Sequence, residues 1–322
     1  MIAMPISASK AASGAAGARE STGPMPDETR ARRAARRHQL RSNTIPALVT
    51  VGPTVLWLAF LVAIPLIYVL VLSFCSIDEY YNVQFQFTTA NYARLLDPTY
   101  VQIYGQSLVI AGCATVICLV LGYPFAYLIS RTFRSKKTIL YMLVIIPFWT
   151  SSLICIYGWR TFMGTTGPLN TFLEAIGVTS GPLDLLYNQG ATIFGMAYSM
   201  FPYMVLPLYA ALEKLDQAQI EASRDLGARF MPTLLRVVVP QTVSGIFSGC
   251  IMVFIPSLGA FFVSDIMGGG NTNVIGNLIQ RQFQSGNNWP LGAALSIILI
   301  VITLLLVKLY QRTGGSLDEL GV

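Results

Sequence analysis

The sequence contains few charged residues for its length. Only 11% of the 322 residues are Asp, Glu, Lys or Arg, whereas about 25% is usual for a soluble domain. Hydrophobic residues make up 54% of the chain, and its mean hydropathy is +0.59. A chain of this length could form two soluble domains, but too few charges remain to cover their surfaces. The composition excludes a soluble enzyme, a disordered protein and a collagen-like chain, which leaves a polytopic membrane protein.

Residues that serve catalysis or metal binding are also scarce. The only histidine is His38, so the apolar part of the chain has none for a serine protease or a metal centre. The five cysteines form no CxxC pair, and we expect them to be buried hydrophobes, not disulfide or metal ligands. No GxxxxGK[ST] motif occurs, so the chain is not expected to hold ATP in a P-loop of its own.

The first 44 residues form a separate region without any apolar run. Their Ala, Ser, Gly, Pro and Arg content predicts a disordered tail. No hydrophobic segment occurs before residue 45, so this region is not expected to be a secretory signal peptide. An arginine cluster between residues 30 and 41 raises the question of nucleic acid or anionic lipid. A solvated tail that keeps the N-terminus in the cytoplasm is the favoured interpretation, and no nucleic-acid partner is expected.

Six long apolar runs follow this tail. A helix of about 20 residues crosses a hydrocarbon core of roughly 30 Å, and the runs lack the alternation of barrel strands. We therefore predict an all-α membrane protein with six transmembrane helices in residues 45–312, followed by a short cytoplasmic tail, 313–322. Prolines inside the runs predict kinks. The runs cover residues 47–74, 107–130, 138–159, 191–212, 243–264 and 290–307.

The basic residues are distributed unevenly between the two sides of this arrangement. With the N-terminus inside, the inside segments hold 18 of the 21 Lys and Arg, and only Arg94, Arg160 and Arg281 lie outside. The positive-inside rule therefore predicts that both termini lie in the cytoplasm. In the outside loop 160–190, the pairs Gly167-Pro168 and Gly181-Pro182 are each expected to begin a short interfacial helix.

The inside loop 213–240 has the local chemistry of a helix–turn–helix. Asp216 and Gln219 have the spacing of a capping box at the start of a helix. This helix is expected to run for about three turns, through Leu226, and Gly227 can adopt the left-handed conformation that ends it.

A second helix is expected after the turn. Pro232 suits its first turn, and Pro240 is expected to bend it into the fifth span. Phe230 and Met231 lie at the bend and are expected to be exposed, as an apolar contact for a partner's groove. Packing of the loop on its own membrane helices is the alternative that periodicity leaves open.

The same loop carries a recognisable motif. Glu221-Ala222-Ser223 is followed by Gly227 and then by the segment 237–240, Val-Val-Val-Pro. This pattern resembles the EAA loop of permease subunits in bacterial ATP-binding-cassette (ABC) importers, with Ser223 in place of the second Ala and valines in place of Ile and Leu. The resemblance implies that the helix around Glu221 docks into a cleft of a separate ATPase subunit. With the exposed bend, the expected coupling residues are Glu221, Ala222, Ser223, Gly227, Phe230 and Met231.

The resemblance covers residues 45–312. Residues 201–213 are similar to the fourth helix of permeases from spermidine/putrescine-type importers, and parts of 268–294 are similar to their connection between the fifth and sixth helices. The resemblance implies a type I importer permease fold, a multi-pass location in the bacterial inner membrane and a polyamine substrate. Relatives of this type also import opines, other amines and some non-amine solutes.

The resemblance also implies partners. These are a second homologous permease, two ATPase subunits that hold ATP and Mg, an external solute-binding protein and membrane lipid, while this chain binds no cofactor itself. The alternative is a self-sufficient secondary carrier that works as a six-helix homodimer. A carrier has no use for a protruding docking helix, and it usually buries several ionisable groups, whereas Asp265 is the only carboxylate close to the predicted membrane core.

The fifth run contains a candidate substrate path. Phe254, Phe261 and Asp265 share one stripe at 100° per residue, with Ser257 beside it. A carboxylate and aromatic faces attract an ammonium group, which suits a polyamine. Helix packing, with Asp265 as a cap at the outer surface, is the alternative. Weaker candidates are Tyr198, Phe201, Tyr203, Phe148 and Trp149.

The charge distribution generates a test of topology. In intact cells, the variant Ser180→Cys should react with an impermeant thiol reagent added outside, because residue 180 lies in a predicted outside loop. The variant Arg134→Cys should not react, because residue 134 belongs to a basic inside segment. The reversed labelling pattern would contradict the orientation.

Overall fold

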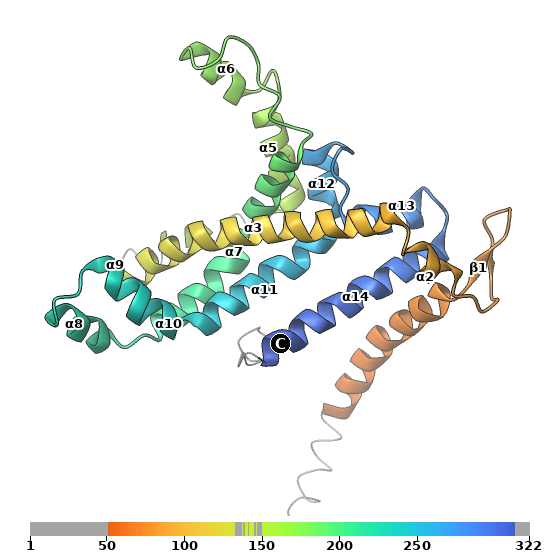
Figure 1. Ribbon diagram of the computed structural model, residues 1–322, viewed down its shortest axis with the longest axis horizontal. Helices are drawn as coiled ribbons and strands as arrows, with labels where there is room; N and C mark the ends of the chain where they lie inside the picture. Colours follow the sequence, from red (N-terminus) through yellow and green to blue (C-terminus); the bar gives the residue numbers. More distant parts are fainter. Residues whose placement is uncertain are drawn as a thin grey trace, which may run out of the picture. The chain divides into compact units, whose positions relative to one another are not determined.

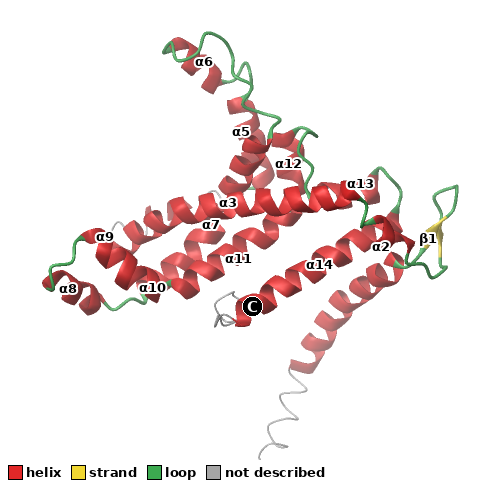
Figure 2. Ribbon diagram, viewed as in Figure 1, coloured by secondary structure: helices red, strands yellow, loops and turns green. Residues whose placement is uncertain are grey.

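The computed structural model describes residues 51–132, 137, 139–140, 142–144, 146 and 150–312. Both predicted tails, 1–44 and 313–322, lie outside the described residues. The chain divides into two compact units, Met1–Pro65 and Leu66–Val322. Described residues are mostly helical, which confirms the predicted all-α class, and the strands β1 (Ser76–Ile77) and β2 (Val83–Gln84) form one short antiparallel hairpin (Figure 2).

Four helices among the described residues are long and apolar enough to cross a membrane. They are Val51–Ser73, α3 (Pro98–Arg131), α7 (Gln189–Glu213) and α14 (Trp289–Arg312). The bent pair Phe230–Gln241 and Val243–Gly259 passes the same test only when its two parts are taken together, which gives up to five spans among the described residues. Together with the third predicted run, only part of which is described, this agrees with the six predicted spans.

The third run is not one unbroken helix. Thr150 and Ser151 are not helical, and a new helix, α5 (Ser152–Met163), begins after them. The prediction of a single helix through residues 138–159 is therefore wrong. Most residues just before this break, Phe148 and Trp149 included, lie outside the described residues.

Shorter helices complete the chain. The helix α6 (Pro168–Ala175) confirms the prediction made from Gly167-Pro168, but residues 182–185 have no helix, so the prediction from Gly181-Pro182 is wrong. The reason is a contact with α6, because the Asn170 side chain accepts from the Leu183 amide at 2.9 Å and donates to its carbonyl oxygen at 3.0 Å. The shorter helices are α2 (Ala90–Arg94), α6 (Pro168–Ala175), α8 (Gln217–Asp225), α9 (Phe230–Thr233), the π-helix η1 (Leu234–Val238), α10 (Val239–Gln241), α11 (Val243–Gly259), α12 (Phe261–Gly268) and α13 (Ile275–Gln284).

The helices α3, α7 and α11 run side by side and enclose the main core (Figure 1). Two glycines one turn apart on α11 let its backbone approach α7. A Cβ atom at Gly245 would lie 2.5 Å from the Cβ of Ala211 and 3.0 Å from the Pro207 carbonyl oxygen, and one at Gly249 would lie 2.8 Å from the Met204 sulfur. Small residues allow such close helix contacts in membranes. The buried core here includes Ile110, Cys118, Met204, Val205, Leu208 and Val253.

The fifth span is interrupted at both ends. At one end, the helical segment Phe230–Gln241 meets α11 at an angle of 72°, and the break falls at Thr242, two residues after Pro240. At the other end, α11 stops at Gly259 and α12 starts at Phe261. The prediction of one helix through residues 243–264 is therefore wrong.

The second break has a clear packing cause. The chain around Gly276 in α13 lies against Gly259, since a Cβ atom at position 276 would be 2.6 Å from the Gly259 carbonyl oxygen. The Asn277 side chain donates to the Phe261 carbonyl oxygen at 3.1 Å. The helix α13 thus packs against the end of α11, and its Asn277 side chain also bonds to the first turn of α12.

The close contact of α7 and α11 generates a stability prediction. Gly245→Val should overpack this contact and destabilise the folded protein by about 1–3 kcal/mol. The expected result is a lower melting temperature in detergent. Gly112→Val on α3 is the matched control, because no neighbouring heavy atom lies within 4 Å of its added Cβ position. Equal melting temperatures for the two variants would show that the α7–α11 contact is not tight.

Candidate functional site

The loop between α7 and α11 forms a helical hairpin, defined here as residues 216–233. As predicted, Asp216 caps its first helix, because the Asp216 side chain accepts from the Ala218 amide at 3.0 Å. Gly227 has φ +81°, a left-handed conformation that disfavours any side chain. Ser223 and Thr233 share a hydrogen bond of 3.1 Å between their hydroxyl groups, so the serine of the motif braces the two helices of the hairpin against each other.

The hairpin has one buried face and one exposed face. Ile220 is 2% exposed and belongs to the main core, which anchors α8. Phe230 and Met231 are 56% and 58% exposed, as predicted, and Leu226 is 89% exposed. The hairpin therefore packs on its own membrane helices through one face and still presents a second, apolar face. No sequence signal distinguishes Leu226 from its neighbours, because it lies within the predicted first helix of the loop.

The motif residues lie at the surface of this hairpin. Glu221 and Ala222 are exposed, and Ser223 is half-buried beside Thr233. A carboxylate on an exposed helix is available to a basic group of another chain. The structure thus brings the six expected coupling residues together on one projecting element (Figure 1).

The predicted substrate stripe is not one stripe. The break at Ala260 separates Phe254 on α11 from Phe261 and Asp265 on α12, so the 100° spacing does not continue from one residue to the next. Ser257 is buried and donates to the Val253 carbonyl oxygen at 2.7 Å. The geometric premise of the stripe is therefore wrong, although each residue remains a separate candidate.

Phe254 and Asp265 have different surroundings. Phe254 lines an apolar cavity of about 300 Å³ between α3, α11 and α14. Asp265 is exposed and accepts a hydrogen bond from the side chain of Asn277, which is itself fully buried. Asp265 thus links α12 to α13, which favours the capping alternative for this carboxylate.

The weaker aromatic candidates take part in packing. The ring of Tyr198 lies edge-on to Trp159 at 5.5 Å, and that of Phe201 lies 6.0 Å from Phe125. Tyr203 is half-buried and packs against the main core. Trp149 lies outside the described residues.

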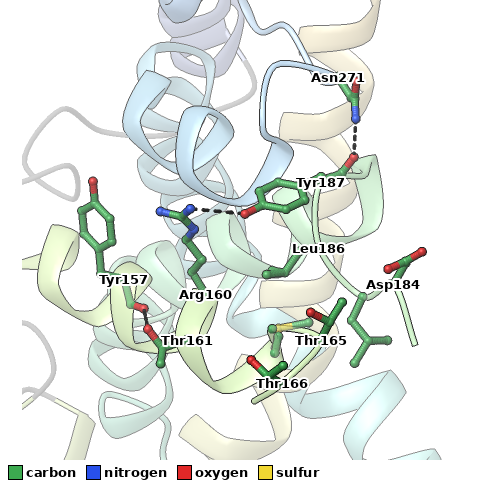
Figure 3. A pocket seen from close by; sticks show the side chains of 12 residues that line it. Tyr157, Arg160, Thr161, Thr165, Thr166, Asp184, Leu186, Tyr187 and Asn271 are labelled. Carbon is green, nitrogen blue, oxygen red and sulfur yellow. Dashed lines mark hydrogen bonds between the residues drawn. The ribbon is translucent and has the colours of Figure 1, made fainter. Parts of the chain in front are cut away.

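A polar cavity that no sequence pattern predicted lies beside α5 (Figure 3). It has a volume of about 600 Å³. The Arg160 Nη2 atom donates to the Tyr187 hydroxyl at 3.3 Å, and Asn271 Nδ2 donates to the Tyr187 carbonyl oxygen at 3.0 Å. These residues come from three separate segments of the predicted outside face, which explains why no local signal revealed them. The lining also includes Tyr157, Thr161, Thr165, Thr166 and Asp184.

The described residues thus form a bundle of apolar helices with a capped, projecting hairpin. Residues 119–313 match the family described as "Binding-protein-dependent transport system inner membrane component". The chain is 43% identical over 271 residues to the spermidine/putrescine transport system permease protein PotB of Haemophilus influenzae. This match covers 84% of this chain and 95% of that protein. It is 43% identical to PotB of Escherichia coli over 263 residues, 82% of this chain and 96% of that protein.

The fold is also similar to solved structures. A chain of a bacterial alginate ABC transporter, crystallised with an alginate pentasaccharide-bound periplasmic protein, superposes with a TM-score of 0.69 over 86% of this chain and 95% of that chain, at 17% identity. The chain described here belongs to the family of binding-protein-dependent transport system inner membrane components. It is a multi-pass permease subunit of an ABC importer in the inner membrane, with the type I permease fold.

Proposed function

We propose that this permease subunit imports a polyamine such as spermidine or putrescine. The proposal is supported by the identity of 43% to the PotB permeases over more than four-fifths of the chain. In the proposed assembly the chain pairs with a second homologous permease and receives its solute from an external binding protein. Two separate ATPase subunits bind ATP and Mg, and they hydrolyse the ATP.

The hairpin is the proposed contact with the ATPase. Its exposed face combines the Glu221 carboxylate with the apolar side chains of Leu226, Phe230 and Met231. An apolar patch with one charge beside it has the composition of a protein interface. ATP-driven closure of the ATPase subunits then moves the hairpin and switches the permease between outside-open and inside-open states.

Two alternatives remain for experiment. A self-sufficient secondary carrier would leave the exposed hairpin face without a partner. An importer of an opine or another solute would keep the whole assembly and change only the substrate. Purification of the tagged protein from its native membrane distinguishes an importer subunit from a secondary carrier, because only the importer subunit should co-purify with ATPase chains.

The coupling proposal predicts the effect of two variants in the hairpin. Glu221→Ala should strand a basic group of the partner, which typically costs 2–5 kcal/mol at an interface. Gly227→Val should distort the turn, since a side chain at a left-handed position costs roughly 1–2 kcal/mol. Both variants should remain in the membrane, yet show reduced uptake and reduced stimulation of ATP hydrolysis, measured in proteoliposomes.

A carboxylate on the predicted outside loop 160–190 provides the control. Glu174→Ala removes an exposed acid of α6 and should leave ATPase recruitment unchanged. Solute affinity of the binding protein should not change in any of these variants. Wild-type recruitment and uptake in both hairpin variants would show that the hairpin is not the docking element.

The substrate proposal predicts a charge effect on transport. Asp265→Asn should weaken polyamine uptake while complex assembly stays intact, if this exposed carboxylate attracts the cation along its path. Glu174→Gln, on the exposed surface of α6, is the matched loss of a carboxylate and should leave uptake unchanged. Unchanged transport kinetics for Asp265→Asn would show that Asp265 serves only to link α12 to α13 through its hydrogen bond with Asn277. Uptake of a neutral or anionic solute, but of no polyamine, would contradict the substrate and leave the importer assignment intact.

A further inference from the structure

The helix α3 contacts the loop between α7 and α11 on three successive turns. The hydroxyl groups of Tyr123 and Thr242 share a hydrogen bond of 2.9 Å. The ring of Tyr127 lies edge-on to that of Phe230, with centroids 5.9 Å apart. The Arg131 Nη1 atom donates to the Gln217 side-chain oxygen.

The spacing of these residues places them on one face of α3. Residues 123, 127 and 131 follow one another at intervals of four, and positions four apart lie above one another on a helix. Arg131 also stacks on its neighbour, since its guanidinium carbon lies 5.5 Å from the centre of the Tyr127 ring. Residues 123, 127 and 131 therefore form one continuous strip, which we call the α3 strip.

The α3 strip holds the loop at its beginning, its middle and its end. Gln217 is the first residue of α8, Phe230 is the first residue of α9, and Thr242 is the break before α11. A loop attached at one point could tilt freely about that point. The contacts therefore connect α3 to the loop at three points, and Tyr127 and Arg131 lie on the last turns of α3, after Pro124.

A separate ion pair lies beside the α3 strip. Lys137 Nζ is 2.6 Å from a carboxylate oxygen of Glu213 and lies 5.2 Å from the centre of the Tyr209 ring. The bond to Glu213 raises the pKa of Lys137 above its usual value. Since the Glu213 side chain is 48% exposed, solvent screens this pair and it adds little stability. Within the α3 strip, the Arg131–Gln217 hydrogen bond is likewise exposed, whereas the Tyr123–Thr242 hydrogen bond is half-buried.

The other contacts of α3 reach into the transmembrane core. The Cys118 thiol donates to the Ala197 carbonyl oxygen of α7 at 3.2 Å. Further along, the Ser107 hydroxyl oxygen accepts from the Ile275 amide at 2.8 Å, which joins α3 to the start of α13. A displacement of α3 at the hairpin thus acts on α7 and on the opposite end of the bundle.

We infer that the α3 strip is a positioning device, which transmits movement of the hairpin to α3 and so to the solute path. This inference rests on the proposed function, in which the hairpin docks on an ATPase. Arg131 is its central positioning residue, because it contacts both Tyr127 and the first residue of α8. Its hydrogen bond reaches Gln217, four positions before Glu221 on α8, so Arg131 acts through the start of α8.

The test uses the complete importer in proteoliposomes, with ATP hydrolysis and polyamine uptake measured together. Arg131→Gln should keep ATPase recruitment and hydrolysis, yet lower the number of solutes imported per ATP by about fivefold or more, as expected for loss of a charged hydrogen bond. Arg131→Lys should keep most of the coupling, because an ammonium group can remain over the Tyr127 ring. Lys214→Gln, an exposed cation of the same loop, is the control and should couple normally.

A second variant covers the case that Arg131→Gln does not fold. Tyr127→Leu removes the ring contacts with Phe230 and Arg131 and should lower the same ratio. An unchanged ratio of uptake to hydrolysis in both variants would overturn the inference. So would a loss of ATPase recruitment equal to that of Glu221→Ala, because Arg131 would then only maintain the docking face. Full recruitment by Glu221→Ala would instead contradict the proposed function, so the two failures are distinguishable.

Discussion

The close approach of α7 and α11 is the contact on which the described architecture depends. Apolar helices gain no hydrophobic free energy from one another in lipid, so their association depends on tight packing and on hydrogen bonds. Gly245 and Gly249 provide that packing against Pro207 and Met204. Because α3 lies against both helices, this one contact sets the position of the hairpin at one end of the bundle and of α12 and α13 at the other.

The two breaks in the fifth span follow from the same constraint. A helix that stops inside or near the membrane leaves backbone groups that must find partners. At the Ala260 break, Asn277 of α13 joins the two parts of the span, because it donates to the Phe261 carbonyl oxygen in the first turn of α12. At the Thr242 break the side chain donates to the Val238 carbonyl oxygen at 3.0 Å and also meets Tyr123. Each break is therefore stabilised by a residue that belongs to a neighbouring turn or to another helix.

Local signals predicted the spans and the hairpin, but not the contacts between distant segments. Long apolar runs, the Asp216 cap and Gly227 act within a few residues, so the sequence reveals them. The break at Ala260 depends on α13, and the extended chain at Leu183 depends on Asn170 in α6. In the sequence, Arg131 is one of 18 Lys and Arg residues in the predicted inside segments, so it indicates only the topology. Its contact with Gln217 lies 86 positions away in sequence, where no periodicity could show it.

The candidate residues for coupling and for the solute lie at opposite ends of one helical bundle. Glu221 and the exposed apolar residues belong to the hairpin, whereas Asp265 and the cavity beside Arg160 belong to the other end. A permease built in this way can change its solute preference without changing its hairpin, because the two sets of side chains share no contact among the described residues. What they share is α3, which meets the hairpin through Arg131 and meets α13 through Ser107. The helix α3 has 34 residues, with Pro124 inside it, and it is long enough to join both ends, which makes it the physical route by which an event at one end reaches the other.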